Sequence, residues 1–133
     1  MRFMLFIHPA VEVEAGDWTP SAEDVATMER YNDELRRAGV LLDLAGLHSP
    51  SEGAAVRWKS GKPVVEDGPF GESKEVIGGY WLIQAGSREE AVEWACRVPN
   101  GGESWIEVRR VQELEDFPPE VQAVLGSEPG PAS

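Results

Sequence analysis

The sequence predicts an α+β fold in which one antiparallel sheet of four strands carries two helices on one of its faces. Three observations lead to this prediction. Apolar and amphipathic segments follow one another in the order strand, helix, strand, and this order occurs twice. A charged segment with a Ser-Gly turn separates the two halves and is typical of a small hairpin. The length of 133 residues suits one domain with its own core.

The first strand–helix–strand unit occupies the first third of the chain. Residues 3–7 alternate between a wholly apolar face and a mixed face, as expected for a strand. Thr19 and Pro20 are typical of a helix start, and Gly39 is typical of a helix end. Residues 40–44 are apolar enough for a central strand. The predicted buried stripe of the helix consists of Val25, Met28, Leu35 and Ala38.

Between the two units, residues 55–59 and 62–66 form a predicted hairpin that turns at Ser60 and Gly61. Residues 75–85 follow as the strongest strand candidate of the chain. Its apolar side chains lie on both faces of the predicted strand, with Ile77, Trp81 and Ile83 on one face and Tyr80 and Leu82 on the other.

That second apolar face has a consequence for assembly. Two helices cover only one face of a sheet, so the other face is left open. An uncovered apolar face of this size is typical of an interface, and closed homodimers are the commonest oligomers. We therefore expect a homodimer in which a second copy closes over the open face.

The second unit begins with a capping box over residues 87–90, before a helix. Residues 104–111 form the last predicted strand, and residues 118–125 form a short amphipathic helix. We expect a domain over residues 1–113 and a partly helical C-terminal extension, frayed at its end, over residues 114–133. The predicted inward residues of the second helix are Ala91, Trp94, Ala95 and Val98.

Composition excludes several classes of function. The net charge is −12, from 24 acidic and 12 basic side chains, which argues against nucleic acid and against anionic membrane surfaces as partners. Cys96 is the single cysteine, so no internal disulfide forms, and we expect it to pack in the core. No apolar run has the length of a signal peptide or a membrane span, which favours a cytoplasmic protein.

The strand alternation also predicts a polar group on the open face of the sheet. Apolar and aromatic neighbours surround His8, Glu107 and Arg109 there, which is typical of a small-molecule site. A histidine beside a carboxylate can move protons near neutral pH, and an arginine can hold an anionic ligand. The alternative is that these charged groups pair with one another, or with residues of the second copy, in the dimer interface and bind no ligand. The predicted ligand-binding neighbours on this face are Phe6, Tyr80 and Trp105.

A second candidate lies in the loop that begins with Asp67, Gly68 and Pro69. Asp67 is a candidate acid/base group, and Glu72 and Lys74, two residues apart, point to one side of an extended segment. The three charges together would bind a ligand, with Lys74 on its anionic group. The alternative is a structural turn whose charges pair with one another or with the partner subunit.

The remaining features predict no cofactor and no metal. The chain has no glycine-rich nucleotide loop and none of the common hydrolase motifs. His8 and His48 are the two histidines and lie far apart, so we expect no transition-metal site, and His48 is expected to be a solvated loop residue.

An ordered set of segments resembles the YCII-related family, and within it the branch of DGPF-domain proteins. The most specific segment is Asp67-Gly-Pro-Phe70, followed by Glu72, Lys74-Glu75 and Gly78-Gly-Tyr80. The other matching segments are Met4-Leu-Phe-Ile7, Glu34-Leu35, Ala38-Gly-Val-Leu41, Gly46-Leu47 with Pro50, Ala91 with Trp94-Ala95 and Val98-Pro99, and Ile106-Glu-Val-Arg109.

The resemblance implies a ferredoxin-like split βαβ sandwich that forms a dimeric α+β barrel, here with a small inserted hairpin. It implies little about function, since most members are uncharacterised. Many are encoded beside extracytoplasmic-function sigma factors. A related branch carries a His-Asp pair proposed as an active site, with the histidine near the first helix. The first helix of this chain has no histidine, so that pair does not transfer.

Two functions are compatible with the sequence. The first is binding of a small organic ligand in the barrel, with cofactor-free proton transfer if the protein is an enzyme. In that case His8 or Asp67 is the acid/base group, and Arg109 or Lys74 holds the ligand. The alternative is a non-catalytic regulatory or interaction module linked to sigma-factor-dependent transcription.

Overall fold

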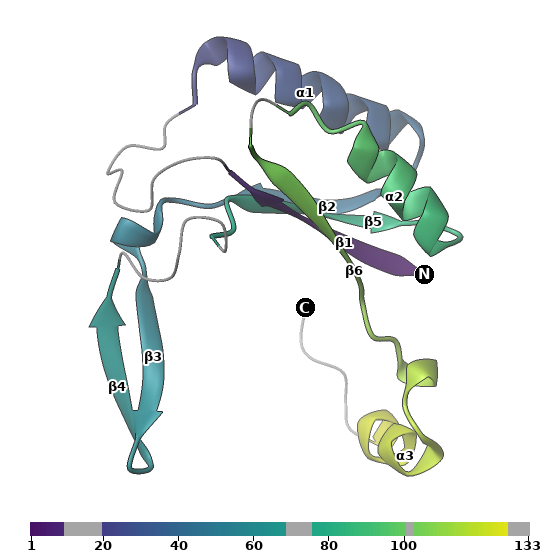
Figure 1. Ribbon diagram of the computed structural model, residues 1–133. Helices are drawn as coiled ribbons and strands as arrows, with labels where there is room; N and C mark the ends of the chain where they lie inside the picture. Colours follow the sequence, from purple (N-terminus) through teal and green to yellow (C-terminus); the bar gives the residue numbers. More distant parts are fainter. Residues whose placement is uncertain (10–19, 69–75, 101–102, 128–133) are drawn as a thin grey trace.

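The computed structural model describes residues 1–9, 20–68, 76–100 and 103–127. Its body is one four-stranded sheet with two helices on one face (Figure 1). In spatial order the strands are β2 (Leu41–Gly46), β5 (Gly79–Gln84), β1 (Arg2–His8) and β6 (Trp105–Arg110). Every neighbouring pair is antiparallel. The covering helices are α1 (Ala22–Arg37) and α2 (Arg88–Cys96). The predicted α+β class and antiparallel sheet are confirmed, and the arrangement is compatible with a ferredoxin-like fold.

The core lies between the two helices and the two central strands. Alternate residues of β1 and β5 point toward the helices, because successive side chains of a strand face opposite ways. Their partners come from the inner sides of α1 and α2. The most buried members of this core are Phe3, Leu5, Ile83, Tyr31, Leu35 and Ala91. Within residues 1–9, 20–68, 76–100 and 103–127, no helix lies on the other face of the sheet (Figure 1).

The start of α1 differs from the prediction. The N-cap is Ser21, whose hydroxyl oxygen accepts a hydrogen bond from the Asp24 backbone N–H at 3.1 Å. A serine at this position satisfies an amide that has no partner within the helix, which explains why the helix begins at Ala22. Pro20 precedes the helix, and Thr19 lies outside the described residues. The end is as predicted, since Gly39 has a φ of +72°.

The buried stripe of α1 is also shifted from its predicted position. Val25 is 51% exposed and Ala38 is exposed, so both assignments were wrong. Leu35 is fully buried as predicted, and Tyr31 and Asn32 are buried with it. The helix therefore packs closely on the sheet through its second half, whereas its first half lies farther from the core.

The second strand, β2, is an edge strand and not a central one. The crossover from β1 through α1 leaves a gap beside β1, and β5 fills it by pairing with β1 on one side and β2 on the other. The pairing of β2 is irregular between Leu41 and Asp43. Strand β5 itself begins at Gly79, so the predicted strand over residues 75–85 was too long. Ile77, predicted to share a face of the strand with Trp81 and Ile83, precedes the strand and is exposed.

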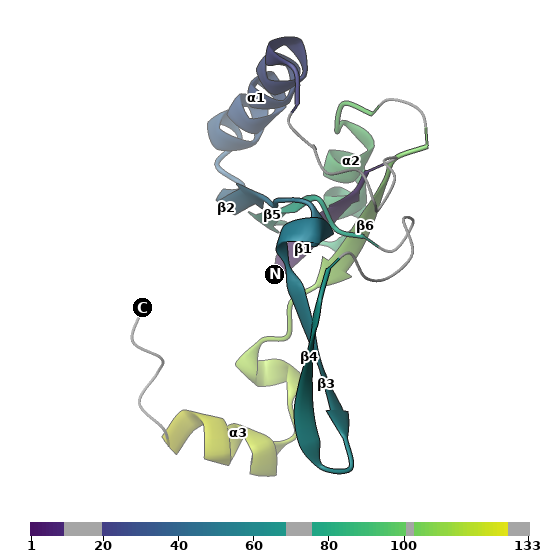
Figure 2. The ribbon, with the colours of Figure 1, turned by 90° about the vertical axis from the view of Figure 1, so that its left-hand side faces the viewer.

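The hairpin forms as predicted from β3 (Ala54–Lys59) and β4 (Lys62–Asp67). Ser60 and Gly61 have φ values of 51° and 77°, which are the positive values that a two-residue hairpin turn needs. The hairpin follows a short 3-10 helix, η1 (Pro50–Glu52). It projects from the side of the sheet opposite to α1 and α2 (Figure 2).

The chain after β6 projects from that same side. It contains a 3-10 turn, η3 (Leu114–Asp116), and a final helix, α3 (Pro119–Ser127). The open face of the sheet therefore lies between two projections, the hairpin and the C-terminal segment (Figures 1 and 2).

Helix α2 follows its predicted capping box. The Ser87 hydroxyl accepts from the Glu90 backbone N–H at 3.1 Å, and the Glu90 carboxylate accepts from the Gly86 N–H at 2.8 Å. Cys96 is exposed at the end of the helix, which corrects the expectation of a core position. Among the described helices, none is both long and apolar enough to cross a bilayer.

Candidate functional site

His8 ends β1 on the open face of the sheet and is nearly inaccessible there. The residue is 4% exposed. It lies directly opposite Trp105 in the β1–β6 pairing, and the two rings are stacked with centroids 3.9 Å apart and planes at 6°. Cross-strand neighbours on one face lie at the distance of a ring contact. The indole therefore holds the imidazole in one orientation.

Glu107 binds the imidazole of His8 from the same face. His8 Nε2 lies 3.0 Å from Glu107 Oε1, while Glu107 Oε2 accepts a hydrogen bond from Arg109 Nη1 at 3.3 Å. The side chains become more exposed along this series, from 5% for His8 to 30% for Glu107 and 69% for Arg109. A ligand on the open face would therefore meet Arg109 and Glu107 before His8.

One ring nitrogen of His8 has no hydrogen-bond partner among the described residues. Nδ1 is buried and makes no hydrogen bond within the part of the chain that the structure describes. A hydrogen bond to the Glu107 carboxylate requires a proton on Nε2, so neutral His8 has a bare lone pair at Nδ1.

Phe6 and Tyr80 complete the group on this face. They lie opposite one another across β1 and β5. The Tyr80 hydroxyl donates to Asp43 Oδ2 at 3.0 Å, and this bond raises the pKa of Tyr80, with desolvation as the next cause. Among the predicted site residues, the structure thus places six on one face of one sheet, namely Phe6, His8, Tyr80, Trp105, Glu107 and Arg109.

Asp67 does not belong to this group. It ends β4 in the separate two-stranded sheet and is exposed. No hydrogen bond or ion pair joins it to His8 among the residues that have described positions. Glu72 and Lys74 lie outside the described residues. His48 is a solvated loop residue as expected, with its side chain 88% exposed and Nδ1 3.1 Å from Glu52.

Comparison with known proteins places the chain in a family. The model of the YCII-related domain matches residues 1–115. The chain belongs to the YCII-related domain family. It is also similar to an uncharacterized protein of Rhizobium meliloti (strain 1021), with 37% identity over 81 residues. That match covers 61% of this chain and 63% of the relative, so it spans less than two thirds of the relative's length.

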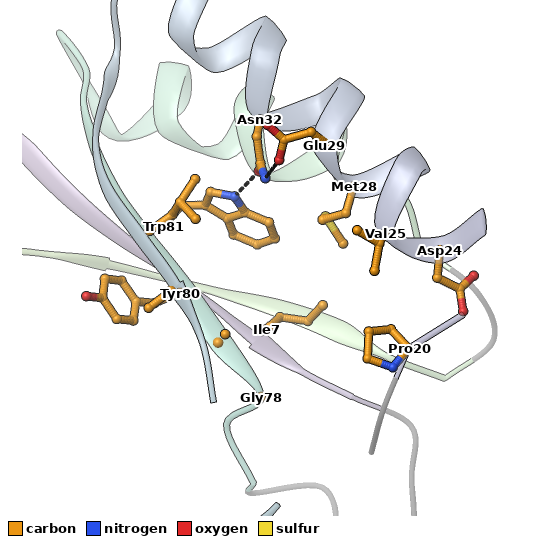
Figure 3. A pocket seen from close by; sticks show the side chains of 14 residues that line it. Ile7, Pro20, Asp24, Val25, Met28, Glu29, Asn32, Gly78, Tyr80 and Trp81 are labelled. Atoms are coloured by element: carbon orange, nitrogen blue, oxygen red, sulfur yellow. Dashed lines mark hydrogen bonds between the residues drawn. The ribbon is translucent and has the colours of Figure 1, made fainter. Parts of the chain in front are cut away.

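This YCII-related domain also contains a feature that the sequence analysis missed. A cavity of about 440 Å³ lies on the helix-covered side of the sheet, beneath the first half of α1 (Figure 3). All predicted ligand contacts were sought on the open face or in the Asp67 loop. The signal that pointed elsewhere was Asn32, an amide on the otherwise apolar stripe of α1, which is 7% exposed. No group of three or more His, Cys, Asp or Glu in the described ranges could hold a metal ion.

The hydrogen-bonded pair of His8 and Glu107 gives the stability of this YCII-related domain a testable pH dependence. The hydrogen bond from His8 lowers the pKa of Glu107, partial burial opposes that effect, and Arg109 lowers the pKa further. A carboxylate with a lowered pKa in the folded state stabilises the protein above its unfolded pKa. That stability is lost as the pH falls through the lower folded pKa.

We therefore expect Glu107→Gln to be less stable than the unsubstituted protein near neutral pH, and the difference to shrink below about pH 4. Chemical denaturation over a pH series measures it. Glu93→Gln, at an exposed position of α2, is the control and should show a smaller effect at every pH. A Glu107→Gln deficit that stays constant or grows at acidic pH would contradict the assignment.

Proposed function

We propose that this chain, as a member of the DGPF branch, forms a homodimeric α+β barrel that binds a small organic acid. The observation that carries the proposal is the linked group on the open face, in which Glu107 lies between a buried His8 and an exposed Arg109. Such a group provides a positive charge for a ligand and a carboxylate beside it, on a surface that is otherwise mainly aromatic and aliphatic.

The dimer is supported by the apolar character of that surface. Phe6 and Leu82 occupy the open face of the two central strands, and Trp105 is 44% exposed beside them. A monomer would leave this face in water, and a second copy of the same face would bury it around a two-fold axis. The hairpin and the C-terminal segment project from this side and can extend alongside a second copy (Figure 2).

The chemistry proposed for the site is cofactor-free proton transfer. Arg109 binds the ligand carboxylate through guanidinium N–H groups that Glu107 does not use. The His8–Glu107 pair accepts a proton from the ligand atom next to the carboxylate and returns it to a neighbouring atom, so that no proton is gained or lost overall. His8 acts with Glu107 as one acid/base pair, since its Nε2 is 3.0 Å from the carboxylate and fixes its orientation. Asp67 has no place in this pair.

A thermal-shift screen of small carboxylic acids tests the proposal, because a ligand that binds only the folded protein raises its apparent stability. We expect at least one acid to raise the melting temperature. Arg109→Ala should weaken its binding about tenfold or more, as expected on losing a charge-assisted hydrogen bond. Arg30→Ala, at an exposed position of α1, is the matched control and should bind as the unsubstituted protein does. Equal affinity for Arg109→Ala would refute the site.

The second candidate function is a non-catalytic interaction module linked to sigma-factor-dependent transcription. One observation favours it, namely the apolar face of the hairpin, where Val56, Trp58 and Val65 are 49%, 69% and 65% exposed. The same screen separates the two functions. An interaction module would form the dimer but bind no organic acid, whether or not Arg109 is present.

A further inference from the structure

The cavity under α1 lies on the opposite side of the sheet from His8. Its walls are the first half of α1 above and strands β1, β2 and β5 below. Figure 3 shows Val25 and Met28 pointing from the helix toward Ile7 on the sheet, with Trp81 at the inner end and Asp24 beside Pro20 at the other. Its volume of about 440 Å³ lies within the range of small-molecule sites.

Two glycines keep the cavity open. Gly46 and Gly79 pair across β2 and β5 on the helix-covered face, so the sheet carries no side chain at this place. A Cβ atom on Gly46 would meet nothing within 4 Å. A Cβ atom on Gly79 would lie 2.7 Å from the Ala45 carbonyl oxygen, so that glycine is also needed for strand pairing. Above them Val25 is 51% exposed, since the helix packs on the core through its other half.

The polar groups of the inner wall are already paired with one another. Trp81 Nε1 donates to Asn32 Oδ1 at 2.7 Å, and Asn32 Nδ2 donates to Glu29 Oε2 at 3.1 Å. The other oxygen of Glu29 accepts from Arg36 at 2.7 Å, and this bond is the main cause of its lowered pKa. The interior therefore offers a ligand apolar surface, because its hydrogen-bonding atoms are engaged.

The charge at the mouth of the cavity is negative. Asp24 and Glu29 are the charged residues of the described lining, and it includes no lysine, arginine or histidine. The Asp24 carboxylate has no hydrogen-bond or ion-pair partner within the described chain, although its backbone N–H is used by the helix cap. Asp24 and Glu23 also offset the positive end of the α1 dipole. The net charge of −12 attracts cations to the whole molecule.

We propose that this cavity binds a small amphipathic cation, an organic amine with an aromatic or aliphatic body. The body lies between Met28, Ile7 and Trp81, and the ammonium group lies at the mouth beside Asp24. This site goes beyond the proposed function, since the open face takes an acid through Arg109 and the cavity takes a base on the other side of the sheet. Neither site shares a charged residue with the other.

Three probes with similar bodies test the charge preference, namely 2-phenylethylamine, 2-phenylethanol and 3-phenylpropanoate. Backbone amide NMR shifts of Gly46 and Gly79 report occupancy at the site itself. We expect the amine to bind most tightly, the alcohol less tightly and the carboxylate least tightly. Asp24→Asn should weaken the amine about fivefold, toward the affinity of the alcohol, as expected on losing one partly exposed ion pair. It should leave the affinity of the alcohol unchanged.

Gly46→Leu tests the location, because its side chain would occupy the cavity without a backbone penalty. We expect it to abolish binding of the amine. Gly126→Leu is the matched control, since a Cβ atom on this α3 glycine also meets nothing within 4 Å. Asp24→Asn changes only an exposed residue and remains informative if Gly46→Leu fails to fold. The proposal would be overturned if none of the probes bound, or if the carboxylate bound as tightly as the amine. It would also be overturned if both cavity variants bound the amine as the unsubstituted protein does. Each result is independent of organic-acid binding at Arg109.

Discussion

Phe6→Asp is expected to convert the proposed dimer into folded monomers. Phe6 lies at the centre of the open face, opposite Tyr80 on one neighbouring strand and Glu107 on the other. A carboxylate introduced there would be buried in the proposed dimer interface beside Glu107, without a positive partner of its own. Burying an unpaired charge costs about 3 kcal/mol or more, which raises the dimer dissociation constant more than about a hundredfold. Sedimentation velocity over a dilution series measures the change.

The fold of the Phe6→Asp protomer should be retained, because Phe6 is not part of the core between helices and sheet. Circular dichroism of the variant should match that of the unsubstituted protein. Phe6→Leu is the matched control and should remain dimeric, since it keeps an apolar side chain at the same position. A folded Phe6→Asp variant with undiminished dimer affinity would show that the interface lies elsewhere.

Leu35→Ala is expected to cause a large loss of stability. Leu35 is fully buried against the central strands. Removing its methyl groups leaves a void that the packed core fills only in part, which costs about 3 kcal/mol of unfolding free energy. Urea denaturation monitored by circular dichroism measures the difference.

Val25→Ala is the control for Leu35→Ala on the same helix. Val25 faces the same side of α1 but is 51% exposed above the cavity, so its truncation should cost less than about 0.5 kcal/mol. Comparing the stability losses of the two variants tests whether the second half of α1 is packed on the core while its first half lies over the cavity. Similar losses at the two positions would mean that the first half of the helix is packed as closely as the second.

The sequence predicted correctly those elements whose conformation is determined by a few neighbouring residues. Ser60 and Gly61 allow a hairpin with a two-residue turn. Ser87 and Glu90 begin a helix because each satisfies an amide at its start. Such signals depend on neighbouring residues alone. They can therefore be recognised in the sequence without knowledge of the tertiary contacts.

The errors in the fold arose where long-range packing decides the outcome. The apolar run at residues 40–44 suggested a central strand, but the position of β2 at the edge depends on β5 filling the gap beside β1. Val25 carries the right side chain for a buried stripe, yet Gly46 and Gly79 on distant strands leave it nothing to pack against. The residues next to β2 and to Val25 in the sequence give no indication of either of these long-range arrangements.

For the candidate site, too, some features could be predicted from local sequence and others could not. The two-residue period of strands was enough to place His8, Glu107 and Arg109 on one face, since faces follow from alternation alone. The stacking of His8 on Trp105 and the 3.0 Å contact with Glu107 depend on the register of β1 against β6, which alternation does not determine. The burial of His8 likewise depends on that register. Asp67 was predicted as the alternative acid/base group from its chemical type, and the sheet topology places it apart from His8.

A direct test of the account is the molar mass of the unsubstituted protein in solution, measured by light scattering at micromolar concentration. Closure of the open face by a second copy predicts a species of twice 14.6 kDa that persists on dilution. A stable species of 14.6 kDa at the same concentration would contradict it. The group of His8, Glu107 and Arg109 would then lie on an open surface and not within a barrel.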